Sequence, residues 1–350
     1  MAGIEVRIGH DIGSASAVPG LDRLSAAERS RLSFSVLSPS APMSSAELAG
    51  AHLAIATPGY AAITAASLPA DGPLTAILRT GVGYNDVDAD ALTARDIALV
   101  IPPEAVRRST AVATVTLILA VTTHLIMRHR HSVTGPEGWV KVGQTPGMSL
   151  TGKTVGIVGL GNVGSEVARL LVPFDCRLIG CDPYIDPAHA AGLGVTLMPL
   201  DDLMRSADVV SLNLILNAET RHIIDASRLA LMKSTAFLVN AARGPVVDQK
   251  ALTDVLAARR IAGAGLDVLD LEPPRGDDPI LQLDNVTISA HALNWTDEYR
   301  ETLQRNIADM LKTLMAGKVP YKVANAAVLD RPGFKRKLAA LAQSKPRRDT

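Results

Sequence analysis

The chain has 350 residues, 47% of them hydrophobic and 20% charged, and is therefore long enough for two domains of ordinary size. Lys plus Arg and Asp plus Glu both number 35, so the net charge is zero and gives no basic footprint for nucleic acid. The first residues carry charges where a signal peptide needs an apolar core, which predicts a cytoplasmic protein.

Short apolar runs alternate with helical segments rich in Ala, Ser and Leu over the first hundred residues. This alternation predicts a parallel sheet with crossover helices. The predicted strands are residues 4–8, 32–37, 53–57, 74–78 and 97–101, and residues 41–51 are one of the helices. The fourth strand leads into a glycine turn at Gly81–Gly83, which is either a site for a small carboxylate or an ordinary turn.

Residues 109–127 contain no charge and are almost long enough to span a bilayer. They include five threonines and a serine and lie in the middle of an α/β pattern. We therefore expect a buried helix at a domain or subunit boundary and no membrane contact. The polar residues 128–151 that follow are predicted to be a linker or a surface connection.

A dinucleotide fingerprint lies between Val155 and Asp182. A short apolar strand, residues 155–158, runs into three glycines with the spacing G-x-G-x-x-G, and a helical pattern and a second strand follow. The first glycine allows the turn, the second lets a pyrophosphate approach the backbone, and the third lets the helix pack on the sheet. They are Gly159, Gly161 and Gly164. Asp182 lies 21 residues after Gly161, at the position of an acid that binds ribose hydroxyls, and it favours NAD over NADP.

The rest of the chain continues the strand and helix pattern. Its predicted strands are residues 195–198, 209–214, 236–240, 262–268 and 286–289. With the fingerprint, they predict a complete Rossmann-type doubly wound domain. The amphipathic residues 296–315 are predicted to return the chain to the first domain. The last twenty residues hold seven Lys or Arg and one acid, which predicts a partly disordered tail rather than a nucleic-acid-binding arm.

Three polar residues follow three successive predicted strands of this domain: Arg243, Glu272 and His291. Each residue also has an ordinary explanation. An Arg before Gly can cap a helix, a Glu before Pro can be a solvated loop residue, and a lone His can have a purely structural role. Together, beyond a dinucleotide fingerprint, they predict hydride-transfer chemistry, which needs a substrate-binding cation, an acid/base and a carboxylate beside it. No metal site is predicted, because the two cysteines alone cannot form one.

The chain resembles the D-isomer-specific 2-hydroxyacid dehydrogenases from about Leu74 to Ile307. The resemblance rests on GVGYNDVD at 81–88, VGIVGLGNVG at 155–164, SADVVSLNLILNAETRHII at 206–224, LVNAARGPVVD at 238–248 and GAGLDVLDLEP at 263–273. It implies a Rossmann domain at residues 109–292 and a flavodoxin-like α/β substrate domain at residues 1–108, completed by a return helix at 293–330. Residues 331–350 would be the basic tail. In that family the active site lies between the domains.

The resemblance also implies roles. Arg243 would bind the carboxylate and carbonyl of a 2-oxoacid or 2-hydroxyacid, His291 would be the acid/base, and Glu272 its partner. For NADH, the implied contacts beyond the three glycines and Asp182 are Asn162, Val163, Ala241, Arg243, Asp267 and His291. The implied substrate contacts are Val82, Gly83, Arg243 and Trp295. A homodimer through the long apolar helix is also expected.

Several positions depart from the family pattern without removing a catalytic group. Ala290, Ala292 and Leu293 surround His291 in place of Pro-His-Ile-Gly, Trp295 stands where a small residue is usual, and Asn213-Leu214-Ile215 replaces His-x-Pro. An NAD-sensing, corepressor-like binding protein and a catalytically specialised paralogue therefore stay open as alternatives. A formate-type dehydrogenase is disfavoured, because that branch has a Gln–His pair where this chain has Glu272.

Overall fold

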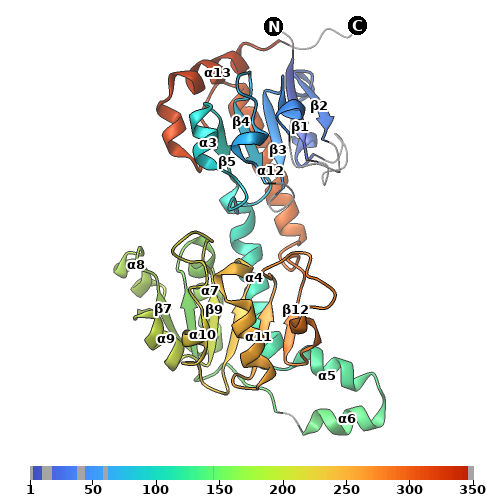
Figure 1. The fold of residues 1–350 in the computed structure, drawn as a ribbon, viewed down its shortest axis with the longest axis vertical. Helices are drawn as coiled ribbons and strands as arrows, with labels where there is room; N and C mark the ends of the chain where they lie inside the picture. The colour runs from blue at the N-terminus through green and yellow to red at the C-terminus, as the bar shows by residue number, and fades with distance from the viewer. Residues whose placement is uncertain (1–2, 10–17, 38–43, 58–61, 145, 346–350) are drawn as a thin grey trace. The chain divides into compact units, whose positions relative to one another are not determined.

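The computed structural model describes residues 3–9, 18–37, 44–57, 62–144 and 146–345. The chain forms two compact units, one from Met1–Val106 with Asp297–Thr350 and one from Arg107–Thr296. Each unit contains a parallel β-sheet with helices packed on both faces (Figure 1). This confirms the predicted α/β class, with a Rossmann sheet and a second, flavodoxin-like sheet.

The first unit has a five-stranded sheet in the order β2-β1-β3-β4-β5, the flavodoxin order. Its strands are β1 (Ile4–Ile8), β2 (Leu32–Val36), β3 (Leu53–Ala56), β4 (Ala76–Arg79) and β5 (Ala98–Val100). Its helices are α1 (Ala26–Arg29), α2 (Ser45–Leu48), α3 (Ala89–Ala94), α12 (Asp297–Met315) and α13 (Pro332–Ala342). Neighbouring residues of a strand face opposite sides: Leu53 and Ile55 pack with α12 and α13, whereas Ala54 packs with α2 and α3.

The predicted disordered tail is wrong for the described residues 331–345. Pro332–Ala342 forms helix α13, in which Phe334, Leu338 and Leu341 are buried in the same core as α12. The basic residues lie outside this apolar stripe, and Lys337 donates a hydrogen bond to the Arg95 carbonyl at 2.7 Å. The prediction counted charge and overlooked the helical spacing of the apolar residues. Residues 346–350 lie outside the described part of the chain.

The second unit has a seven-stranded sheet in the order β12-β11-β10-β9-β6-β7-β8. Its strands are β6 (Thr154–Val158), β7 (Arg177–Cys181), β8 (Val195–Leu197), β9 (Val209–Leu212), β10 (Phe237–Asn240), β11 (Gly263–Leu266) and β12 (Val286–Ile288). Helices α4 (Pro103–Thr122), α7 (Asn162–Leu171) and α8 (Pro187–Gly192) cover one face. Helices α9 (Leu200–Ser206), α10 (Ala226–Leu229) and α11 (Gln249–Ala257) cover the other. The strand order reverses at β6, where doubly wound proteins bind their ligands.

The apolar helix α4 and the segment after it differ in how well they were predicted. Helix α4 is long and apolar enough to cross a membrane, but 67% of its most apolar stretch is buried and packs on the second sheet. The buried helix is therefore confirmed, and the homodimer through it stays a prediction. The segment predicted as a linker or surface connection lies at the surface, where nearly all of its residues from 128 to 144 are exposed or half-buried, but it also forms α5 (Leu125–Ser132) and α6 (Pro136–Gly143), which the prediction did not include. A Cβ at Gly138 would lie 1.9 Å from the His131 carbonyl oxygen, so this glycine lets the two helices pack closely.

Candidate active site

The three fingerprint glycines each have a visible steric reason. Gly159 has φ +86°, and a Cβ there would lie 2.6 Å from the Asn213 carbonyl oxygen. A Cβ at Gly164 would lie 1.9 Å from the Gly159 carbonyl oxygen, so α7 can pack this close to the turn only with glycine. A Cβ at Gly161 would meet nothing within 4 Å. The turn therefore has open space at Gly161, on the side from which a pyrophosphate would approach the backbone.

Asp182 is joined directly to this turn. It follows β7, its Oδ2 accepts a hydrogen bond from the Leu160 N–H at 2.8 Å, and its Oδ1 accepts one from the Tyr184 N–H at 2.9 Å. The carboxylate is thus held beside the glycine turn while each oxygen keeps a lone pair for another donor. Tyr184 in turn donates its hydroxyl to Glu219 at 2.8 Å.

These residues fit a bound dinucleotide. Asn162 and Val163 begin α7, so their N–H groups have no partner within the helix and lie at its positive end. A phosphate is stabilised at such a position. The open space at Gly161 would accommodate the pyrophosphate, and the fixed carboxylate of Asp182 would accept hydrogen bonds from the ribose hydroxyls.

Arg243 lies on the loop after β10, and Asn240 at the end of that strand and Gly244 fix its position. The buried Asn240 accepts a hydrogen bond from the Ala242 N–H at 3.0 Å and donates one to the Arg243 carbonyl at 2.9 Å. A Cβ at Gly244 would lie 1.9 Å from the Leu269 carbonyl oxygen. Glycine at this position therefore lets the Arg243 loop pack against the backbone that leads to Glu272.

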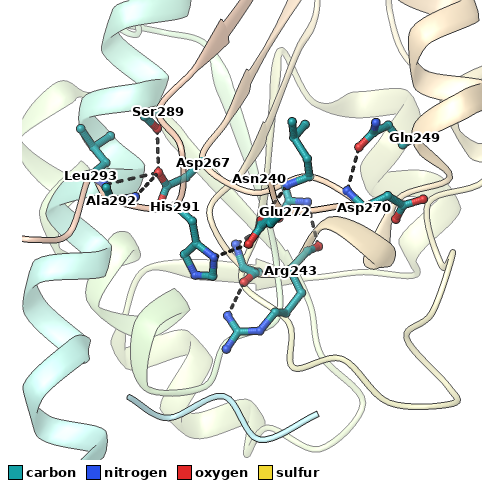
Figure 2. A network of polar contacts seen from close by, with 12 residues as sticks. Asn240, Arg243, Gln249, Asp267, Asp270, Glu272, Ser289, His291, Ala292 and Leu293 are labelled. Atoms are coloured by element: carbon teal, nitrogen blue, oxygen red, sulfur yellow. Dashed lines mark hydrogen bonds and ion pairs between the residues drawn. The ribbon is translucent and has the colours of Figure 1, made fainter. Parts of the chain in front are cut away.

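Glu272 and His291 form a pair between the loops after β11 and β12. The Nδ1 of His291 donates to Oε2 of Glu272 at 2.7 Å, and Oε1 of Glu272 accepts from the Leu269 N–H at 2.9 Å. Figure 2 shows the imidazole turned toward Glu272, with Arg243 on the neighbouring loop. Both side chains of the pair are partly exposed, so a small molecule can reach the imidazole.

The surroundings of Glu272 favour its charged form. Burial alone would raise the pKa of its carboxyl group, but the hydrogen bond and charge of His291 and the Leu269 N–H outweigh it, with a further contribution from the charge of Arg243. The net result is a pKa below the usual glutamate value. The three candidate residues are therefore close enough to interact electrically, and Glu272 is a carboxylate at neutral pH.

Asp267 holds the loop that carries His291. This buried carboxylate follows β11, and its Oδ1 accepts from the Ser289 hydroxyl at 2.7 Å and from the N–H groups of Ala292 and Leu293 at 3.2 and 3.3 Å (Figure 2). Ala290 and His291 have φ of +54° and +53°, an unfavourable conformation for residues other than glycine. Such a backbone persists only where its surroundings hold it, and Asp267 is one of the groups that do so.

The second unit brings together Arg243, Glu272, His291 and Asp267. Two further predicted residues belong to the same unit: Ala241 lies two residues before Arg243 in the sequence, and Trp295 lies four residues after His291. Trp295 is 67% exposed. Val82 and Gly83 belong to the first unit, in the turn after β4.

Sequence reasoning missed Gln249, which donates to Asp278 at 2.9 Å and accepts from the Asp270 N–H at 2.8 Å, and so fixes the loop of Glu272. It also missed Asn240 and Gly244. The only sequence signal for them was their nearness to Arg243 in the motif LVNAARGPVVDQ.

Comparison with known proteins gives one consistent family. The model of the D-isomer specific 2-hydroxyacid dehydrogenase NAD binding domain matches residues 115–292. A glyoxylate reductase of Korarchaeum cryptofilum is 36% identical over 267 residues, 75% of this chain and 80% of that protein. The structure of Rhodotorula graminis D-mandelate dehydrogenase is similar with a TM-score of 0.79 and 25% identity, over 93% of this chain and 98% of that one. The structure of a glyoxylate reductase from Paecilomyes thermophila is similar with a TM-score of 0.74 and 27% identity, over 91% of this chain and 96% of that one.

Proposed function

Because the chain belongs to the D-isomer specific 2-hydroxyacid dehydrogenase family, we propose that it interconverts a 2-oxoacid and a D-2-hydroxyacid with NAD as cofactor. The main support is the 2.7 Å pair of His291 and Glu272 with Arg243 on the next loop, at the carboxyl edge of the sheet that also carries the glycine turn. A cation, a proton donor and a carboxylate are the groups that reduction of a 2-oxoacid needs.

Each of these side chains has a separate task in the proposal. A bound nicotinamide would provide the hydride for the carbonyl carbon. The guanidinium of Arg243 binds the substrate carboxylate and polarises the carbonyl. Since Nδ1 of His291 donates to Glu272, the proton on Nε2 is the one available to the carbonyl oxygen. Glu272 stabilises the protonated imidazole and fixes its orientation.

The remaining proposed contacts follow the family resemblance. N–H groups of Val82 and Gly83 bind the substrate carboxylate, and Trp295 contacts the substrate side chain. Ala241 and Asp267 would line the nicotinamide end of a bound cofactor. The direct test is NADH oxidation with glyoxylate, hydroxypyruvate, pyruvate and phenylglyoxylate. Turnover of at least one is expected, and no oxidation across this panel would contradict the proposal.

We expect NADH to bind at least about tenfold more tightly than NADPH. The reason is that the Asp182 carboxylate beside a 2′-phosphate costs about 1.4 kcal/mol or more. The Asp182→Asn variant keeps an acceptor oxygen for the turn but loses the charge, so the two dissociation constants should approach each other. Fluorescence titration with both cofactors measures this. The exposed Asp277→Asn change is the control. Equal affinity of the wild type for both cofactors would contradict the assignment.

The Glu272→Gln variant should lower kcat for reduction by at least about tenfold. The pKa of Glu272 lies below the usual glutamate value, so its carboxylate stays charged through the usual glutamate range and accepts the Nδ1–H of His291 as a charged partner. Glutamine keeps the size of the side chain but removes this charge, so the imidazole is held and stabilised less well. Steady-state kinetics with NADH and the best 2-oxoacid measure the effect. A wild-type kcat would show that Glu272 does not support the acid.

A further inference from the structure

A hydrogen bond between Tyr184 and Glu219 joins the loops that follow β7 and β9. The Tyr184 hydroxyl donates to Oε2 of Glu219 at 2.8 Å. Strand β6, which leads into the glycine turn, lies between β7 and β9 in the sheet. The two loops therefore lie on either side of the glycine turn, and the bond connects them where the strand order reverses.

The backbone at both ends of this bond is fixed. On the first loop, the Tyr184 N–H donates to Oδ1 of Asp182 at 2.9 Å. On the second loop, Oδ1 of Asn217 accepts from the N–H groups of Glu219 and Thr220, both at 2.9 Å. The two side chains can therefore meet without the ordering of two free loops, although Tyr184 is 81% exposed.

The bond brings a second carboxylate to the side of the site where Asp182 lies. The pKa of the Tyr184 hydroxyl is raised by its hydrogen bond to Glu219, and the charges of Glu219 and Asp182 both contribute. Both carboxylates therefore lie within electrostatic range of the same hydroxyl group. Within the described ranges of the chain, neither carboxylate forms an ion pair with a basic side chain. Their charges are thus left to act on a ligand.

We propose that Glu219, held in place by Tyr184, is a second specificity-determining residue that excludes a 2′-phosphate from the cofactor. This inference rests on the proposed function, in which Asp182 binds the hydroxyls of the adenosine ribose. A 2′-phosphate on that ribose faces the carboxylates of both loops and is repelled by both. A 2′-hydroxyl carries no charge and meets no such repulsion. Tyr184 is the positioning residue, because its hydroxyl keeps Glu219 turned toward the loop of Asp182.

The test separates the charge of Glu219 from the bond that holds it. Glu219→Gln removes the charge and keeps an acceptor oxygen for the tyrosine hydroxyl, whereas Tyr184→Phe removes the bond and keeps the charge. The double variant completes the cycle. The matched control is Glu137→Gln, an exposed glutamate of α6 in the same unit.

The measured quantities are the dissociation constants of NADH and NADPH, obtained for the full chain by fluorescence titration. AMP and adenosine 2′,5′-bisphosphate are then titrated as competitors of NADH. This second pair lacks the nicotinamide and differs only in the 2′-phosphate, so it reports on the adenosine end of the site alone.

We expect Glu219→Gln to tighten NADPH binding by at least about threefold while NADH binding stays within about twofold of the wild type. The ratio for AMP and adenosine 2′,5′-bisphosphate should change in the same direction. Tyr184→Phe should act in the same direction by a smaller factor. The double variant should match Glu219→Gln, because the bond matters only while the charge is present. Salt should weaken the discrimination more in the wild type than in Glu219→Gln.

Two results would overturn the inference. One is a Glu219→Gln variant with the wild-type ratio of NADPH to NADH affinity. The other is an equal loss of both affinities, because that would show that the bond only holds the loops. Effects of Glu219→Gln and Tyr184→Phe that simply add would refute the positioning role of Tyr184.

The proposed function can fail separately from this inference. A wild-type protein that binds both dinucleotides but turns over no 2-oxoacid would overturn the proposed function alone, because the binding ratios do not depend on turnover. A wild-type protein that binds neither dinucleotide would overturn both.

Discussion

The His291→Ala variant is expected to lower kcat by at least about 100-fold in both directions of the reaction. The imidazole lies in a loop held by Asp267 and is joined to Glu272 through Nδ1, so its other nitrogen carries the exchangeable proton. Alanine removes that proton and adds no bulk. Water can replace the imidazole as proton donor only in part, so the loss should be large. Steady-state kinetics with NADH and the best 2-oxoacid measure it.

The control for this variant is His129→Ala, an exposed histidine of α5 in the same unit. It should leave kcat, KM and NADH affinity unchanged. NADH binding to the His291→Ala variant should stay within about threefold of wild type, since the glycine turn and Asp182 are intact. A kcat within twofold of the wild type would remove His291 from the role of acid/base.

The second large effect is expected from Arg243→Ala, which should lower kcat/KM by at least about 100-fold. The guanidinium is proposed to bind the carboxylate and carbonyl of the substrate, so its loss weakens both binding and polarisation. Arg243→Lys should recover only a small part, because one ammonium group does not reproduce the planar fork of the guanidinium. The measurement is kcat/KM together with the inhibition constant of oxamate.

A suitable control is Arg275→Ala, on the loop that follows Glu272. Arg275 is exposed and pairs with Asp277 at 3.1 Å, and an exposed pair of this kind contributes little. Its kcat/KM should match the wild type. If Arg243→Ala kept wild-type kcat/KM and oxamate inhibition, Arg243 would not be the substrate ligand.

Much of the fold could be predicted from the sequence because its signals are local. Short continuous apolar runs predicted the strands of both sheets, and the glycine spacing predicted the turn after β6. The prediction failed where composition outweighed spacing. Basic residues concealed α13, whose buried face is Phe334, Leu338 and Leu341, and polar residues concealed α5 and α6.

The sequence by itself determined which chemical groups follow which strands, since Arg243, Glu272 and His291 each stand directly after an apolar run. Only the tertiary structure decided how they meet. Gly244 has to lack a Cβ because the backbone of Leu269, 25 residues later, packs against it. Asp267 accepts a hydrogen bond from Ser289, 22 residues later, and so holds the loop that carries His291. Such close approaches depend on the register of parallel strands, which sequence spacing does not specify.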